Sequence, residues 1–124
     1  MKIENTTGQL RALSDRLFSL IEELSGERPH LVGNTEWYRA QSTDGPFVYL
    51  RLVGERARTL PPNAVHLATK WDDSLANTQV VPGNNWYGER SADLVVQAAK
   101  ADDIGPAEAF IRTAFRLYGK RSSC

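Results

Sequence analysis

Aromatic and basic side chains recur at alternate positions in three short segments of the chain that are rich in strand-forming residues. Aromatic rings stack on nucleobases, and Arg or Lys neutralises phosphate. A sheet face that carries both kinds of side chain is therefore typical of a protein that binds single-stranded nucleic acid or nucleotides. With one aromatic from a later loop, the candidate ligand-binding residues are Trp37, Arg39, Tyr49, Arg51, His66, Lys70 and Trp86.

The histidine in this set also raises the question of acid–base chemistry. His66 and Lys70 are followed by Asp72 and Asp73, and a histidine beside carboxylates can act as a general acid or base. No spacing of a known mechanism accompanies them. The chain has no Gly-x-Ser-x-Gly elbow and no dinucleotide fingerprint, and its single cysteine, Cys124, excludes an internal disulfide or a cysteine-based zinc site. We predict no cofactor and no metal site, and we assign no catalytic residue.

Residues 82–90, "PGNNWYGER", place two aromatics among turn-forming residues. Gly and Asn fit a turn because they tolerate positive φ angles. No turn requires Trp86 or Tyr87, so these rings have another role. They either cover an open end of the core or form the rim of a pocket with Trp71 and Arg90.

Hydrophobic periodicity changes along the chain from helical to alternating and back. Apolar residues at three- and four-residue spacing predict helices over residues 7–25 and 107–118. Period-two alternation between turn residues predicts strands, which cover residues 35–42, 47–53, 65–70 and 91–97. The expected fold class is α+β: a two-layer sandwich in which an antiparallel sheet of three to four strands carries an N-terminal and a C-terminal helix on one face.

The alternation assigns each strand residue to one of two faces of the sheet. The helix-covered face receives the apolar positions Tyr38, Ala40, Val48, Leu50, Leu52, Val65 and Leu67. The opposite face receives Trp37, Arg39, Gln41, Phe47, Tyr49, Arg51, His66 and Lys70, with Asp93 and Gln97 as further candidates. We expect a ligand to contact this second face and the loop around Trp86.

Composition favours one globular domain over residues 1–124. The 15 basic and 15 acidic residues cancel, so no overall field attracts nucleic acid or an anionic membrane. Residues 37–71 are nevertheless net basic, with Arg56 and Arg58 among their cations, whereas residues 72–108 are net acidic. The N-terminus lacks the apolar run of a signal peptide and no segment is long and apolar enough to span a membrane. We therefore expect a cytoplasmic protein without a membrane partner.

The order of elements and several short motifs resemble a known family. The motifs are Y-x-A at Tyr38 and Ala40, F-V-x-L at Phe47, Val48 and Leu50, Trp86 and Gly88 before the last strand, and A-x-x-x-I-R-x-A-F at Ala107, Ile111, Arg112, Ala114 and Phe115. Together they resemble a small bacterial domain of unknown function of the "predicted transport protein" type, which is also found appended to restriction-like proteins. The resemblance covers most of the chain, but it rests on core and turn positions and transfers no catalytic residue.

Three hypotheses of function follow from these patterns. The first is a binding or interaction module whose aromatic and basic sheet face contacts a nucleic acid or a nucleotide. The second is a homodimer in which the same face packs against its copy, because exposed aromatic sheet faces also mark interfaces. The third is a small enzyme that uses His66 with Asp72 or Asp73. The sequence leaves all three open, including whether the protein is an enzyme.

Overall fold

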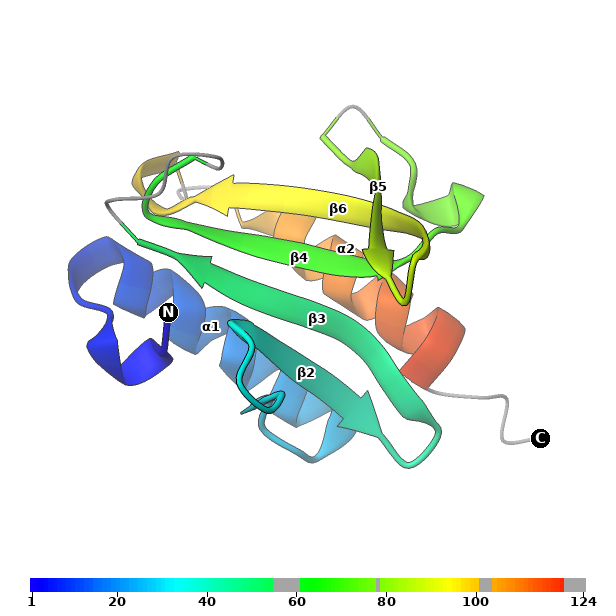
Figure 1. Ribbon diagram of the computed structural model, residues 1–124, viewed down its shortest axis with the longest axis horizontal. Helices are drawn as coiled ribbons and strands as arrows, with labels where there is room; N and C mark the ends of the chain where they lie inside the picture. The colour runs from blue at the N-terminus through cyan, green and yellow to red at the C-terminus, as the bar shows by residue number, and fades with distance from the viewer. Residues whose placement is uncertain (55–60, 78, 101–103, 120–124) are drawn as a thin grey trace.

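The computed structural model describes residues 1–54, 61–77, 79–100 and 104–119, so Arg56, Arg58 and Cys124 lie outside the described residues. Within them the strands form a six-stranded sheet in the order β1-β2-β3-β4-β6-β5, in which every neighbouring pair is antiparallel (Figure 1). The strands are β1 His30–Leu31, β2 Trp37–Ser42, β3 Gly45–Val53, β4 Ala64–Lys70, β5 Val81–Trp86 and β6 Glu89–Gln97. The helices are α1 Gly8–Ser25 and α2 Gly105–Ala114, with the short helical turns η1 Ile3–Asn5, η2 Asp73–Leu75, η3 Ala98–Lys100 and η4 Phe115–Gly119.

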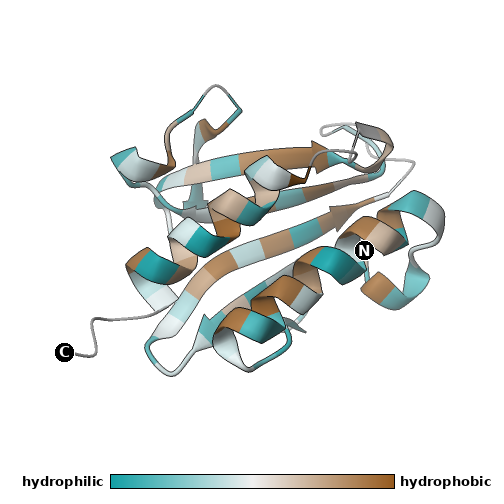
Figure 2. Cartoon of the chain, turned by 180° about the vertical axis from the view of Figure 1, so that it is seen from behind, coloured by the Kyte–Doolittle hydropathy of each residue, from teal (hydrophilic) through white to brown (hydrophobic). Residues whose placement is uncertain are grey.

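Both α-helices lie on one face of the sheet. Figure 1 shows them behind the strands, and Figure 2, which looks from the other side, shows them in front. Helix α1 buries Leu10, Leu13 and Leu17 against the sheet because these residues share one side of the helix. Helix α2 adds Phe110 and Ile111 to the same core. The described residues leave the opposite face of the sheet without a helix.

The structure confirms an α+β chain with an antiparallel sheet, and it corrects the number of strands. The sheet has six strands, not three or four. One addition is the two-residue strand β1, which is too short to show a period. The other is β5, where the sequence favours a loop because Pro82, Gly83, Asn84 and Asn85 are poor strand formers.

A β-bulge corrects the expected position of Phe47. Ala40 pairs with Val48, whereas the next residue, Gln41, pairs with Pro46, so Phe47 has no partner on β2. The extra residue turns the ring of Phe47 toward the helices, where it is fully buried 5.1 Å from the ring of Phe115. The hydroxyl of Thr69 donates to the carbonyl oxygen of Phe47 at 2.6 Å. Phe47 is therefore a core residue, and the prediction that it lies on the uncovered face was wrong.

A tight hairpin joins β5 to β6 through Tyr87 and Gly88. Their φ angles are 51° and 78°, and two successive positive φ angles are typical of a two-residue type I′ turn. The hairpin curls over the uncovered face, because β5 crosses in front of β6 and β4 in Figure 1. At its tip the hydroxyl oxygens of Tyr87 and Tyr49 lie 2.5 Å apart, although Tyr49 belongs to β3. The hairpin thus forms a wall across part of this face.

Candidate functional site

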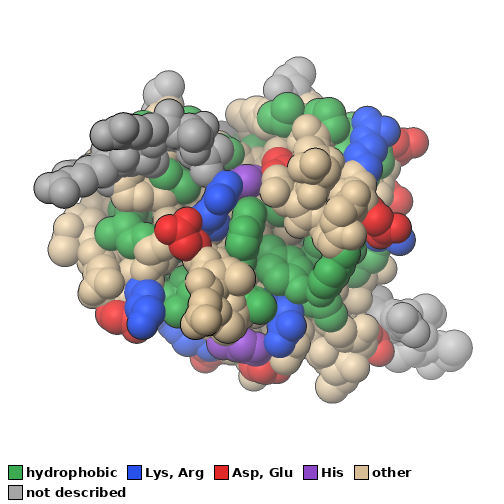
Figure 3. All heavy atoms as spheres, viewed as in Figure 1, with side chains coloured by type: hydrophobic (Ala, Val, Ile, Leu, Met, Phe, Trp, Pro, Cys, Tyr) green, Lys and Arg blue, Asp and Glu red, His purple; other side chains and the backbone are tan. Residues whose placement is uncertain are grey.

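The uncovered face is built from three rows of residues that cross the strands. The register pairs residues directly across neighbouring strands, so the side chains of a row share one face. Figure 3 shows hydrophobic side chains gathered at the middle of this face, next to Arg or Lys and His atoms. The rows are Trp37, Arg51, His66 and Val95; then Arg39, Tyr49, Ala68, Asp93 and Val81; then Lys70, Ser91 and Gly83.

The alternation thus correctly predicted the face for six of the seven candidate residues. Trp37, Arg39, Tyr49 and Arg51 are partly exposed, and Lys70 is exposed. The sixth, His66, is 4% exposed. Five of these residues lie in two adjacent rows.

His66 lies at the centre of a hydrogen-bonded chain that fixes its tautomer. The Nη2 group of Arg51 lies 3.0 Å from Nδ1 of His66, and Nε2 of His66 lies 2.7 Å from Oδ2 of Asp93. Because a guanidinium only donates, Nδ1 must accept and Nε2 must carry the proton that it donates to Asp93. Both ring nitrogens of His66 are therefore occupied.

Asp93 accepts hydrogen bonds from three donors, one on each of three strands. It accepts hydrogen bonds from His66, from the hydroxyl of Ser91 and from the amide Nδ2 of Asn85. Burial alone raises the pKa of the Asp93 carboxyl, but these hydrogen bonds outweigh it and hold that pKa below its usual value. Gly83 makes room for the carboxylate, since a Cβ atom there would lie 2.9 Å from Oδ1 of Asp93. Asp93 thus ties β5 to the rest of the face.

Trp86 packs against the tyrosine rings of the uncovered face. It is 8% exposed, and its ring centre lies 5.4 Å from those of both Tyr49 and Tyr87 in edge-to-face geometry. On another side it meets Tyr118 of η4 at 6.3 Å. Trp86 is therefore buried among three tyrosine rings and does not line an open surface, while the neighbouring Tyr87 is 71% exposed.

An open hollow of about 200 Å³ lies between the hairpin and the β2 side of the sheet. Trp37 and Tyr49 line it from the sheet, and Asn85 and Tyr87 line it from the hairpin. Val32 and Thr35, which precede β2, complete the lining, and it is mainly apolar. The hollow therefore offers flat aromatic surfaces with polar groups at its edge.

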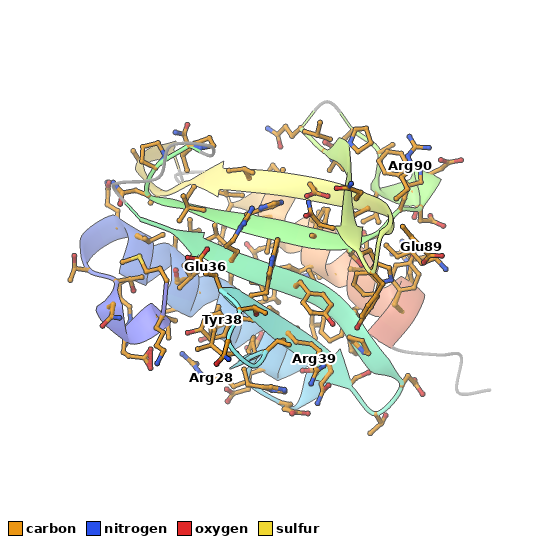
Figure 4. The ribbon with its side chains drawn as sticks, in the orientation of Figure 1. Arg28, Glu36, Tyr38, Arg39, Glu89 and Arg90 are labelled. Atoms are coloured by element: carbon orange, nitrogen blue, oxygen red, sulfur yellow. The ribbon has the colours of Figure 1, made fainter. Side chains whose placement is uncertain are left out.

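Cations flank the hollow on the side of β2 and β3. The guanidinium carbon of Arg51 lies 4.6 Å from the ring centre of Trp37, so the cation stacks on this ring. Arg39 projects from β2 beside Tyr49 (Figure 4). Burial and the hydroxyl of Tyr87 raise the pKa of Tyr49 to about 12, and Arg39 acts in the opposite direction. The Tyr49 phenol therefore stays uncharged at neutral pH and can donate a hydrogen bond.

Trp71 and Arg90 form a separate pair, not the rim of this hollow. The guanidinium of Arg90 stacks at 4.2 Å on the ring of Trp71, whose indole N–H donates to Asp73. Figure 4 places Arg90 at the far side of the hairpin from Arg39. Asp72 accepts from the backbone N–H of Ser74. The carboxylate that reaches His66 is consequently Asp93, and the contacts give no support to a pairing of His66 with Asp72 or Asp73.

Sequence reasoning did not place Asn85 and Ser91 beside Asp93 on the uncovered face, and it did not separate Tyr87 from Trp86. Asn85 was explained as a turn residue and Ser91 as the start of a strand. Tyr87 was treated together with Trp86, although the two rings point to different environments. The available signal was Gly88, because a two-residue turn at Tyr87 and Gly88 would have placed Asn85 on a strand.

Comparisons of the chain with known proteins supply no functional information. No protein-family model, curated protein or solved structure matches the chain. The resemblance to the domain of unknown function therefore stays a prediction. In the part of the chain that the structure describes, His, Cys, Asp and Glu side chains form no group of three or more that could hold a metal ion. None of the described helices combines the length and apolar character needed to cross a bilayer.

Proposed function

We propose that the chain is a two-layer sandwich whose uncovered sheet face binds single-stranded nucleic acid or a nucleotide, with one base held in the hollow. The observation that carries this proposal is the convergence of Trp37, Tyr49 and Tyr87 on one open hollow beside Arg51. These residues come from two strands, β2 and β3, and from the turn between β5 and β6, so the fold itself assembles the aromatic surface.

The size of the hollow favours a single planar ring. Sites for drug-sized ligands measure about 300–1,000 Å³, whereas this hollow measures about 200 Å³ and is open. Stacking of a base on an aromatic side chain contributes about 1–3 kcal/mol. Trp37 is suited to this role because the Arg51 cation stacks on its ring and holds the ring in place. One unstacked base is the guest that fits these features best.

The charges of the face fit a phosphate backbone that runs past the hollow. Arg39 lies next to Tyr49 in the second row, and Lys70 is exposed in the third. Asp93 is the acidic residue in the three rows, and its carboxylate is occupied by three hydrogen bonds. Arg39 and Lys70 are therefore the cations that we assign to phosphate contacts.

Removal of the exposed ring at the rim tests the proposal. The variant Tyr87→Asn suits the positive φ of this turn, since Asn is one of the residues enriched there. We expect it to weaken binding of a mixed-sequence single-stranded oligonucleotide of about eight nucleotides by roughly 5- to 150-fold, because about 1–3 kcal/mol of stacking is lost. Tryptophan fluorescence titration measures the affinity.

Arg16→Ala is the matched control, because Arg16 is exposed on α1 at the helix-covered side. It should bind as the unchanged protein does. Two results would contradict the proposal. One is that the oligonucleotide does not change the fluorescence of the unchanged protein, and the other is that it binds Tyr87→Asn with full affinity.

Self-association is the second candidate, because the hairpin exposes Val81 by 58% as well as Tyr87. Large exposed apolar side chains are found at protein interfaces. In that case Tyr87→Asn would convert a dimer to a monomer in size-exclusion chromatography with light scattering. A monomeric unchanged protein would remove this candidate.

A further inference from the structure

A hydrogen-bonded chain next to the hollow has a fixed donor and acceptor pattern, and it ends at Asn85, which lines the hollow. This pattern begins at Arg51, which can only donate, and passes through His66 to Asp93, as the distances of 3.0 Å and 2.7 Å show. An ionised carboxylate has acceptors only, so every group that faces Asp93 must donate to it. Each hydrogen in the chain is therefore placed by the partner before it.

Asn85 takes its orientation from this chain. Its Nδ2 group donates to Oδ2 of Asp93, and its backbone N–H donates to the hydroxyl of Ser91 at 3.0 Å. A flipped amide would point Oδ1 at the carboxylate and lose the hydrogen bond. Asn85 also lines the hollow, and its carbonyl oxygen Oδ1 has no hydrogen-bond partner among the described residues.

The paired phenols supply the complementary donor. One hydroxyl of Tyr49 and Tyr87 donates to the other, and the second hydroxyl proton is free for another acceptor. Both rings line the hollow together with Asn85. The rim therefore presents an acceptor on Asn85 and a donor on the phenol pair to whatever enters.

We propose that Asn85 determines specificity and that the hollow selects a base that carries an exocyclic amine next to a ring nitrogen acceptor, as adenine and cytosine do. This inference rests on the proposed binding of a base in the hollow. The amine donates to Oδ1 of Asn85, and the neighbouring ring nitrogen accepts from the phenol pair. Uracil and thymine present a carbonyl oxygen in place of the amine, which faces Oδ1 with a second acceptor.

Cytosine and uracil make the sharpest pair of probes, because they share ring size and differ in the amine and the adjacent ring nitrogen. Single-stranded oligodeoxycytidine and oligodeoxyuridine of equal length are titrated against the unchanged protein by tryptophan fluorescence. We expect oligodeoxycytidine to bind about five- to tenfold more tightly, as one hydrogen bond of ordinary strength provides.

The variant Asn85→Ala should remove this preference and leave the weaker affinity for both probes. Asn84→Ala is the matched control, because Asn84 is the exposed neighbour in the same strand, and it should keep the preference. Thermal unfolding of both variants checks that the hairpin is intact.

Equal binding of the two probes by the unchanged protein would overturn the inference and leave the proposed function standing. A preference that survives in Asn85→Ala would overturn the role of Asn85. Failure of both probes to bind would instead overturn the proposed function, and this inference with it.

Discussion

We expect the free energy of unfolding of the Asp93→Ala variant to be about 3 kcal/mol lower than that of the unchanged protein. Removal of the carboxylate leaves the donors of His66, Ser91 and Asn85 without an acceptor. His66 and Ser91 are buried, and a buried polar group left unpaired costs about 1–3 kcal/mol. Asn85 is exposed, so water replaces its lost partner at little cost. Urea denaturation at neutral pH measures the difference.

The pH dependence of this loss follows from the direction of the Asp93 pKa. The folded state holds that pKa below the unfolded value of about 3.9, so the carboxylate stabilises the fold above the unfolded pKa. The contribution is lost as the pH falls through the folded pKa. The difference between Asp93→Ala and the unchanged protein should therefore shrink under acid conditions below pH ~3.9. A difference that is small at neutral pH, or that grows in acid, would contradict this account.

Replacement of Phe47 by alanine is expected to cost about 3–5 kcal/mol of unfolding free energy, the range for a fully buried Phe. The bulge places this ring in the core against Phe115. The ring also packs on the backbone of Gly119, where a Cβ would lie 2.9 Å from the Phe47 ring. Denaturant unfolding measures the loss. Val81→Ala is the control, because Val81 is exposed and such surface changes stay within about 0.5 kcal/mol.

The result for Phe47→Ala separates two placements of the ring. A ring on the uncovered face, as plain alternation predicts, would cost little when removed and would weaken oligonucleotide binding. A ring in the core destabilises the protein strongly. A loss of unfolding free energy below about 1 kcal/mol, far under the range for a core Phe, would show that the Phe47 ring does not lie in the core.

Alternation predicted most of the uncovered face, because strands have a strict period of two and the apolar positions of β2, β3 and β4 specify the opposite face. Trp37, Arg39, Tyr49 and Arg51 lie where this rule puts them. The rule fails at Phe47 because one inserted residue reverses the side-chain direction locally. Nothing in the identity of an aromatic residue marks such an insertion.

The hairpin wall was not predicted, and the reason is different. Gly83, Asn84 and Asn85 are more typical turn residues than Tyr87, so local propensity does not single out the turn at Tyr87 and Gly88. The actual turn at Tyr87 and Gly88 is stabilised by tertiary contacts, namely the hydroxyl pair with Tyr49 and the packing on Trp86. Long-range contacts of this kind decide the geometry of the hollow. They leave no periodic pattern in a single sequence.

The most direct test of base binding in the hollow is to follow the three tryptophan indole N–H signals by ¹H–¹⁵N NMR during addition of single-stranded oligodeoxycytidine. Trp37 lines the hollow, whereas the indole N–H of Trp71 is bonded to Asp73 on a separate surface. We predict that the Trp37 signal shifts progressively and saturates while the Trp71 signal stays in place. A Trp37 signal that does not move at saturating oligonucleotide would contradict the account.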